Sequence, residues 1–235
     1  MLLSFQNTSL AVVIGATGGI GAAVLAQLQA TSQFTRAIGL SRSTAPALDL
    51  LDEASIQACA QHVASLALPV RLVVDATGIL YGDSMQPEKS WQQLDAAQMT
   101  KAFAINAIGP ALVMKHFLPL LPKSGKSVFA SLSAKVGSIG DNRLGGWYSY
   151  RASKSALNQL VHTAAIELRR RSPEAVCVVL HPGTVATALS SPFAKTGLDV
   201  QTPGESAGKL LAVIDGLTAA DSGGFFNHVG SVLPW

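Results

Sequence analysis

The sequence predicts a doubly wound α/β fold, in which helices cover both faces of a mostly parallel sheet. Short apolar runs of strand length alternate with longer helix-like segments along the whole chain, as in parallel sheets covered by helices. A glycine-rich turn, Gly15–Gly21, joins the first apolar run to the first helical segment. The 235 residues are 49% hydrophobic and 13% charged, which supplies a substantial core and excludes intrinsic disorder.

The expected elements follow in order from the hydrophobic pattern. Each expected strand is a short apolar run, and in chain order these are 10–14, 37–40, 47–48, 71–75, 127–131, 175–180 and 225–227. Each expected helix fills a gap between strands, and these are 19–31, 53–66, 91–118, 148–171 and 203–217. The chain has no repeat, low-complexity tract or linker, so we expect a single domain over residues 1–235.

Two glycine-rich or proline-rich regions are expected to be loops. Residues 135–146 follow the strand at 127–131, and residues 182–204 follow the strand at 175–180. Both loops leave the carboxyl ends of strands, which is the edge where open α/β sheets bind ligands. The second region is long enough to form a lid.

The N-terminal part of the chain carries no charge before Arg36, and its first acidic residue is Asp49. A signal peptide requires a basic residue before its apolar run, and none precedes the first apolar run here. Glycines interrupt that run well before the ~20 residues that a membrane span needs. Cys59 and Cys177 lie in apolar stretches without CxxC spacing, which indicates free thiols in a reducing compartment. We therefore expect a soluble, cytoplasmic protein without a membrane span.

Charge and histidine spacing argue against two other classes of partner. The net charge is +3, but the basic residues are spread along the chain, and the one cluster, Arg169–Arg171, fits a helix end. A nucleic-acid footprint needs a basic stripe with aromatic platforms. The five histidines show no metal-ligand spacing. We expect a small-molecule partner, with no nucleic acid and no metal.

The glycine-rich turn indicates dinucleotide binding. Glycine lets the backbone turn tightly and approach a pyrophosphate, whose charge is met by backbone amides at the helix N-terminus. The spacing here is G-x-x-x-G-x-G rather than G-x-G-x-x-G, so a purely structural turn is the alternative. Because the turn follows the first strand, we expect the cofactor to contact Gly15, Thr17, Gly18, Gly19, Ile20 and Gly21.

The residues after the second strand favour NADP over NAD. An NAD site normally carries an acidic residue about 20 residues beyond the glycine loop, to bind the ribose 2′-hydroxyl. Here Ser41, Arg42 and Ser43 occupy that place, and an arginine with two hydroxyls suits a 2′-phosphate. The alternative is that Arg42 is an ordinary solvated loop residue.

Tyr150 and Lys154 provide the chemistry of an acid or base. Their spacing places a phenol and an ammonium on one face of a helix. A nearby lysine cation favours the phenolate, so we expect Lys154 to lower the Tyr150 pKa from about 10 and make the hydroxyl a workable acid or base near neutral pH.

Taken together, these motifs resemble the short-chain dehydrogenase/reductase family, which implies a Rossmann-type fold. The resemblance covers nearly the whole chain and includes, in order, the glycine turn, Asp49-Leu50, Asp75-Ala76-Thr77-Gly78, Asn106, the Tyr150 and Lys154 pair, and His181-Pro182-Gly183-Thr184-Val185-Ala186-Thr187. The stretch from Val136 to Tyr150 looks most like the C-factor and sniffer carbonyl-reductase-like branch. The family resemblance also implies a homodimer or homotetramer, through the helices beginning near Trp91 and Tyr148.

The resemblance implies roles for individual residues. Tyr150 would donate a proton to the substrate carbonyl, and Lys154 would hold the cofactor ribose and bias Tyr150. Asn106 would interrupt its helix and hold a water linked to Lys154, the alternative being an amide merely tolerated in a buried helix. Further cofactor contacts would come from Asp49, Leu50, Ala76, Thr77, Gly78, Pro182, Gly183, Val185 and Thr187.

One position departs from the family pattern. The catalytic serine usually stands three positions before Gly137, and that position is Ala134. We expect Ser133 to orient the carbonyl instead, with Ser138 as the other candidate.

The function predicted from the sequence is NADP-dependent interconversion of a carbonyl and an alcohol. The substrate is expected to be small and fairly apolar, because Ala188, Leu189, Pro192 and Phe193 lie in the expected lid, with Leu144 and Trp147 across the cleft. The alternative, motivated by Ala134 and by the C-factor resemblance, is an NADP-binding regulatory or cell-signalling protein with little turnover.

Overall fold

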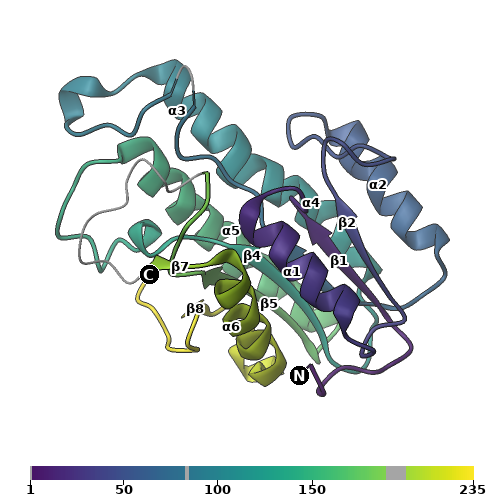
Figure 1. The fold of residues 1–235 in the computed structure, drawn as a ribbon. Helices are drawn as coiled ribbons and strands as arrows, with labels where there is room; N and C mark the ends of the chain where they lie inside the picture. The colour runs from purple at the N-terminus through teal and green to yellow at the C-terminus, as the bar shows by residue number, and fades with distance from the viewer. Residues whose placement is uncertain (1, 83–84, 189–199) are drawn as a thin grey trace.

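The computed structural model describes residues 2–82, 85–188 and 200–235, which form a twisted parallel sheet between two layers of helices (Figure 1). The sheet has the order β2-β1-β3-β4-β5-β8, and every neighbouring pair is parallel. Its strands are β1 (Leu10–Ile14), β2 (Arg36–Leu40), β3 (Val70–Asp75), β4 (Ser127–Leu132), β5 (Ala175–His181) and β8 (Phe225–Asn227). All residues of β1, β3 and β4 are buried, which explains why continuous apolar runs identify them.

The predicted doubly wound fold is confirmed, but the predicted strand at 47–48 is wrong. The amide of Leu48 donates to the carbonyl of Ser41 at 2.9 Å, inside a local loop that follows β2. Pro46 has no amide hydrogen, so this segment is a poor partner for the outer edge of β2. The other strands lie within one residue of their predicted bounds.

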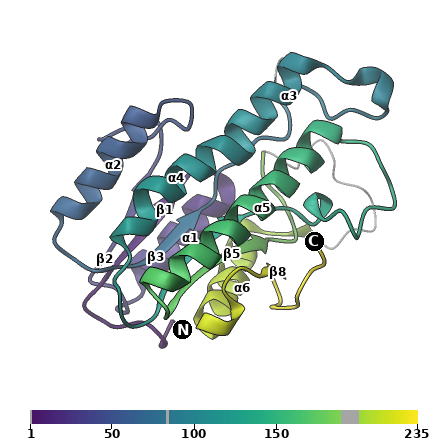
Figure 2. The same cartoon turned by 180° about the vertical axis from the view of Figure 1, so that it is seen from behind.

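Helices cover both faces of the sheet, as the two views show (Figures 1 and 2). One layer contains α1 (Gly19–Ala30) and α6 (Pro203–Gly216), and the opposite layer contains α2 (Glu53–Ser65), α4 (Gly109–Phe117) and α5 (Tyr148–Arg171). In β1, Ala11 and Val13 pack into the first layer, whereas Val12 and Ile14 pack into the second. The two-residue period of the strand therefore feeds two separate cores.

The helix predicted over 91–118 is divided into several pieces. It comprises η1 (Trp91–Gln93), α3 (Ala96–Phe103), the π-turn η2 (Ala104–Ile108), α4 and η3 (Leu118–Leu120). The Asp95 side chain accepts a hydrogen bond from the Gln98 amide at 2.8 Å, so α3 begins with an N-cap rather than at Trp91. The predicted interruption at Asn106 is confirmed by the π-turn.

Among the described residues, the stretch Ala96–Leu120 is the one helix long and apolar enough to cross a membrane. It runs beside α5 in the helical layer (Figure 2). Its α4 portion places Val113, Met114 and Phe117 in the core.

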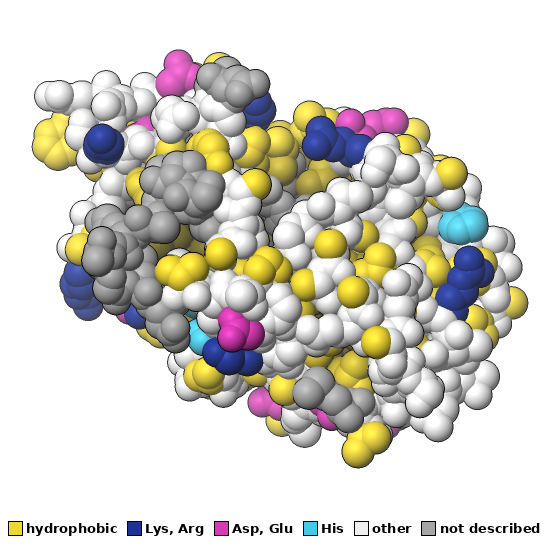
Figure 3. Space-filling view, in the orientation of Figure 1, with side chains coloured by type: hydrophobic (Ala, Val, Ile, Leu, Met, Phe, Trp, Pro, Cys, Tyr) yellow, Lys and Arg dark blue, Asp and Glu magenta, His cyan; other side chains and the backbone are white. Residues whose placement is uncertain are grey.

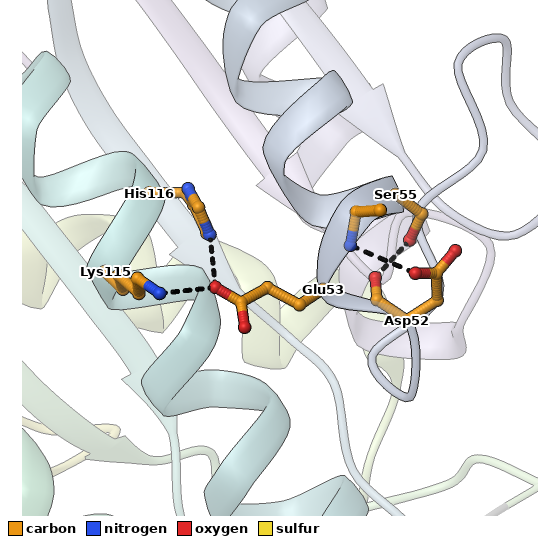
Figure 4. A network of polar contacts seen from close by, with 6 residues as sticks. Asp52, Glu53, Ser55, Lys115 and His116 are labelled. Atoms are coloured by element: carbon orange, nitrogen blue, oxygen red, sulfur yellow. Dashed lines mark hydrogen bonds and ion pairs between the residues drawn. The ribbon is translucent and has the colours of Figure 1, made fainter.

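Ion pairs join α2 to α4 at the surface (Figure 4). Glu53, in the first turn of α2, contacts Lys115 Nζ at 2.6 Å and His116 Nε2 at 3.0 Å. These contacts hold the pKa of Glu53 below its usual value. The side chain of Asp52 caps the same helix by accepting from the Ala54 amide at 3.0 Å.

The carboxyl ends of the strands meet at one edge of the sheet, and the loops that carry the predicted site residues leave from this edge. The loop after β4 includes η4 (Lys135–Gly137), and β5 is followed by the short parallel pair β6 (Thr184–Val185) and β7 (Val200–Gln201). The turn η6 (Ala219–Asp221) precedes β8. On the face shown in Figure 3, charged side chains are scattered among uncharged and hydrophobic ones.

Candidate active site

The glycine-rich turn forms a tight backbone cradle at the start of α1. Gly15 has a φ of +78°, and a Cβ on Gly21 would lie 2.2 Å from the Gly15 carbonyl oxygen, so the turn requires glycine at both positions. Gly18 caps α1 without a side-chain hydrogen bond, and no acidic residue lies in the first turn. These exposed amides and the helix dipole suit an anionic group.

The segments after β3 and β5 pack against this cradle. A Cβ on Gly15 would lie 3.1 Å from the Ala76 carbonyl carbon, and a Cβ on Gly19 would lie 2.7 Å from Thr187 Cγ2. The Pro182 carbonyl accepts a hydrogen bond from Ser206 Oγ at 3.0 Å, which ties the Pro182–Gly183 turn to α6. The fold therefore brings three predicted cofactor-binding segments together around the start of α1.

The loop after β2 buries Ser41 and exposes Arg42. Ser41 is buried, its hydroxyl lies 3.0 Å from that of Ser43, and its amide donates to Thr44 Oγ1 at 3.0 Å. Arg42 is exposed beside them. The loop is thus shaped by hydroxyl hydrogen bonds while one guanidinium faces solvent.

Asp49 and Leu50 lie at the end of the same loop. The Asp49 carboxylate accepts from the Leu51 amide at 3.0 Å, and the Asp49 amide donates to Ser55 Oγ at 2.9 Å. Leu50 packs closely on Gly109, because a Cβ added to Gly109 would lie 2.7 Å from the Leu50 Cβ. Asp49 is thus tied to the start of α2, and Leu50 is packed against the start of α4.

Tyr150 and Lys154 are buried one turn apart near the N-terminus of α5. Tyr150 is 8% exposed, and burial raises its pKa to about 12. The expectation that Lys154 lowers the Tyr150 pKa is therefore not met, because the loss of hydration on burial disfavours the phenolate. Burial lowers the Lys154 pKa to about 8, against an opposing effect of Asp75. The Lys154 ammonium donates to the Leu132 carbonyl at 2.8 Å.

Asn106 is fully buried in the π-turn and fixes the loop after β3. Its Oδ1 accepts from the Ile79 amide at 2.8 Å, and its Nδ2 donates to the Ile79 carbonyl at 2.8 Å. Nδ2 also donates to Ser153 Oγ at 3.1 Å, which links the loop to α5. This amide is a satisfied buried group that joins two elements of the site.

The Ser133 hydroxyl is hydrogen-bonded to a residue of α5 other than Tyr150. The Ser133 hydroxyl donates to Asn158 Oδ1 at 2.6 Å, and Asn158 lies about two turns beyond Tyr150 on α5. Ser138, the other candidate, donates its hydroxyl to the Trp235 carbonyl at 3.3 Å. Ala134, at the position where the family carries serine, is partly exposed.

Two residues that the sequence analysis missed organise the start of α5. The buried carboxylate of Glu88 accepts from the Ser149 amide and hydroxyl, and the Glu88 carbonyl accepts from the Trp147 amide. Although burial alone would raise the Glu88 pKa, hydrogen bonds chiefly from Ser149 hold it below its usual value. Arg151 binds the carbonyls of Gly146, Val136 and Gly145. Their charge was the one sequence signal for these two residues, and it is weak. The contacts of both Glu88 and Arg151 exist only once the loops have folded.

His181 ends β5 immediately before the Pro182–Gly183 turn. Burial, together with the positive fields of His228 and Lys135, lowers its pKa to about 4. The His181 and His228 rings lie 6.5 Å apart between centroids. His181 is therefore a neutral imidazole over the physiological range.

A doubly wound sheet with a glycine cradle and a buried tyrosine–lysine pair at its carboxyl edge defines an oxidoreductase with a Rossmann-type fold. The family model for short chain dehydrogenases matches residues 9–197, and the chain belongs to this family. The resemblance predicted from the sequence is confirmed.

Individual relatives agree with this assignment. The C-signal of Myxococcus xanthus is 40% identical over 144 residues, which cover 60% of this chain and 81% of that protein. The 1-hydroxy-2-glutathionyl-2-methyl-3-butene dehydrogenase of Rhodococcus sp. (strain AD45) is 30% identical over 237 residues, covering 97% of this chain and all (100%) of the relative.

Solved structures show the same fold. The NADPH-bound carbonyl reductase from chicken fatty liver superposes with a TM-score of 0.85 at 27% identity, covering 98% of this chain and 95% of that one. The carbonyl reductase Sniffer of D. melanogaster gives a TM-score of 0.83 at 22% identity, covering 98% of this chain and 100% of that one, which is a likeness of fold.

Proposed function

We propose that this chain is an NADP(H)-dependent oxidoreductase that interconverts a carbonyl and an alcohol, with Tyr150 as the proton donor. The observation that carries the proposal is the burial of Tyr150 and Lys154 one turn apart, at the sheet edge where the glycine cradle also lies. The likeness to an NADPH-bound carbonyl reductase supports the same cofactor and reaction.

The residues at the sheet edge fit such a cofactor. The close-packed turn from Gly15 to Gly21 leaves amides at the uncapped start of α1, which suit a pyrophosphate. Exposed Arg42 beside Ser41 suits a 2′-phosphate, because no acidic side chain precedes Asp49 in the chain. The remaining contacts would come from Asp49, Leu50, Ala76, Thr77, Gly78, Pro182, Gly183, Val185 and Thr187.

The chain's own residues supply the proton chemistry. Bound NADPH supplies the hydride that reduces the carbonyl carbon. Because burial raises the pKa of Tyr150 to about 12, its hydroxyl keeps its proton at neutral pH and donates it to the carbonyl oxygen as the alcohol forms. Lys154 would hold the cofactor ribose, which is the role that the family resemblance implies for it. Asn106 holds the loop after β3 against α5, and the water assigned to it stays a prediction.

A second candidate function is a cofactor-binding regulator with little turnover. The observation that favours it is the hydroxyl arrangement: Ala134 stands at the serine position, and Ser133 is committed to Asn158. Loss of one donor to a developing oxyanion costs a factor on the order of 10² to 10³ in rate. The relative named C-signal is compatible with such a role.

The substrate, the assembly and the location of the protein are also proposals. We propose a small, fairly apolar carbonyl substrate and a cytoplasmic, single-domain protein. Of the residues expected around the substrate, Leu189, Pro192 and Phe193 lie outside the described residues, Leu144 is exposed, and Trp147 packs edge-on against Tyr150. A homodimer or homotetramer through the helical stretch that follows Trp91 and through α5 is supported by the exposed apolar side chains of Ile108 on η2 and of Leu160 and Ile166 on α5.

The experiment measures NADPH oxidation with a panel of aldehydes, ketones and quinones. We expect turnover by the wild-type protein, and loss of turnover in Tyr150→Phe with NADPH binding retained, because the ring stays while the proton donor is removed. The absence of turnover across the panel by cofactor-saturated protein would favour the regulator. Activity that survives in Tyr150→Phe would remove Tyr150 as the donor.

A further inference from the structure

Asp75 is a buried carboxylate that the proposed reaction does not use. It is the last residue of β3, at the carboxyl edge of the sheet, and it is 0% exposed. A buried ionisable side chain is expensive unless it is hydrogen-bonded or paired with an opposite charge. The groups around Asp75 must therefore compensate for the cost of burying it.

Three donors surround the Asp75 carboxylate. Oδ1 accepts from the Thr77 amide at 3.1 Å and from the Thr77 hydroxyl at 2.6 Å. Oδ2 accepts from the Ser131 hydroxyl at 2.8 Å. An ionised carboxylate is an acceptor only, so donors on both oxygens favour the charged form, whereas burial raises the Asp75 pKa.

Both anchors of Asp75 adjoin residues that contact Lys154. Ser131 precedes Leu132, whose carbonyl accepts from Lys154 Nζ at 2.8 Å. Thr77 precedes Gly78, where a Cβ would lie 3.3 Å from Lys154 Nζ. The carboxylate and the ammonium are thus held on the same two stretches of backbone, at the ends of β3 and β4.

The other titratable groups on the elements packed against α5 are mostly basic. They are Lys101 on α3, Lys115 and His116 on α4, Lys135 on η4, and Cys177 and His181 on β5, while Tyr150 and Arg151 stand within one turn of Lys154 on α5 itself. Lys135 is half exposed and lies 3.4 Å from Asp141. Asp75, on β3, is the charged group that raises the Lys154 pKa against the larger effect of burial.

We propose that Asp75 is a positioning residue that keeps the Lys154 ammonium charged inside the buried site and fixes the loop that holds it. A negative charge at β3 offsets part of the cost of burying the lysine cation. The same carboxylate orders Thr77 and therefore the close approach of Gly78 to Lys154. Its relevance to catalysis rests on the proposed function, because that function assigns Lys154 its role.

The test is a titration of Lys154 in the cofactor-free protein by NMR of ¹³C-labelled lysine, with the signal identified by its loss in Lys154→Met. We expect a midpoint near 8 in the wild type. In Asp75→Asn, which keeps the shape and removes the charge, we expect the midpoint to fall by about one pH unit. Ser131→Ala is the matched control, because it removes one hydrogen bond to Asp75 and leaves the charge.

A wild-type midpoint in Asp75→Asn would overturn the proposal, as would an equal shift in Ser131→Ala. If Asp75→Asn does not fold, Lys154→Met gives the reciprocal measurement. The Asp75 carboxyl, followed by ¹³C NMR, should then titrate at higher pH than in the wild type, and an unchanged carboxyl midpoint would overturn the pairing. The titration needs no turnover, so a protein that shows the Lys154 shift but reduces no carbonyl contradicts the proposed function alone.

Discussion

Tyr150 and Lys154 show how burial and charge divide the chemistry of one helical turn. Burial opposes the charged form of each residue, so the phenol keeps its proton and the ammonium releases its proton more readily. A protonated phenol is the form needed to donate to a carbonyl oxygen, whereas the cation must be sustained by its surroundings. The Leu132 carbonyl and the Asp75 carboxylate are the groups that stabilise the Lys154 cation.

The missing serine gives a prediction at this scale. Ala134→Ser should raise kcat by a factor on the order of 10 to 10³, because it restores a hydroxyl donor at the family position, and Ala134 is partly exposed with an extended backbone that accepts serine. Steady-state kinetics of NADPH oxidation measure the change. An unchanged or lower kcat would mean that the site already supplies another donor.

Ser133→Ala is the companion to that experiment. It should leave kcat within about twofold and lower the free energy of unfolding by about 1 kcal/mol, because the bond to Asn158 at 2.6 Å is lost. Urea denaturation and kinetics on the same sample separate the two effects. A loss of 10²-fold in kcat, on the scale of an oxyanion donor, would return the carbonyl-orienting role to Ser133.

Arg42 carries the predicted choice of cofactor. Arg42→Glu should raise the Kd for NADPH at least about tenfold and leave the Kd for NADH nearly unchanged, because a carboxylate repels a 2′-phosphate and can accept from a 2′-hydroxyl. Fluorescence titration with each cofactor measures both constants. Equal losses for the two cofactors would show that Arg42 does not recognise the phosphate.

At the scale of elements, the start of α5 is fixed by a loop that lies far away in sequence. Trp147 caps the helix in a left-handed conformation with φ of 54° and no side-chain cap of its own. Glu88 provides the cap from the loop between β3 and α3, and Arg151 fastens the loop after β4 to the same turn. Tyr150 therefore takes its position from three segments.

Glu88→Ala should lower both stability and activity. The lost cap costs about 1 kcal/mol, and kcat falls because the turn that carries Tyr150 is no longer held. Glu205→Ala is the matched control, since Glu205 completes the capping box of α6, a helix without a proposed catalytic residue. Thermal unfolding and kinetics compare the two variants. Equal kcat in both would reduce Glu88 to a structural cap.

At the scale of the whole molecule, the sequence predicts what depends on local pattern. Residues 10–14 and 148–171 have their predicted bounds, because a continuous apolar run and a sustained helical period need no distant partner. The strand predicted at 47–48 is wrong because the Leu48 amide, two residues after a proline, finds its hydrogen-bond partner within a local loop. Glu88 could not be predicted, because its contact with Ser149 spans 61 residues and exists only in the folded chain. The site motifs were predictable as spacing, whereas the direction of the Ser133 hydroxyl depends on packing against α5.

The pH dependence of folding is a property of the whole molecule, and His181 should contribute to it in weak acid. Burial lowers its folded-state pKa from 6.5 to about 4, so the unfolded chain binds a proton that the folded one refuses. Its contribution to stability is complete above about pH 6.5 and is lost, by up to about 3 kcal/mol, as the pH falls towards 4. Asp75, whose pKa burial raises, acts in the opposite direction, so the measured quantity is the difference between wild type and His181→Gln. Urea unfolding at about pH 7 and about pH 4.5 should show a smaller loss of stability in the variant than in the wild type. Parallel curves for wild type and His181→Gln would mean that His181 is hydrated in the folded protein.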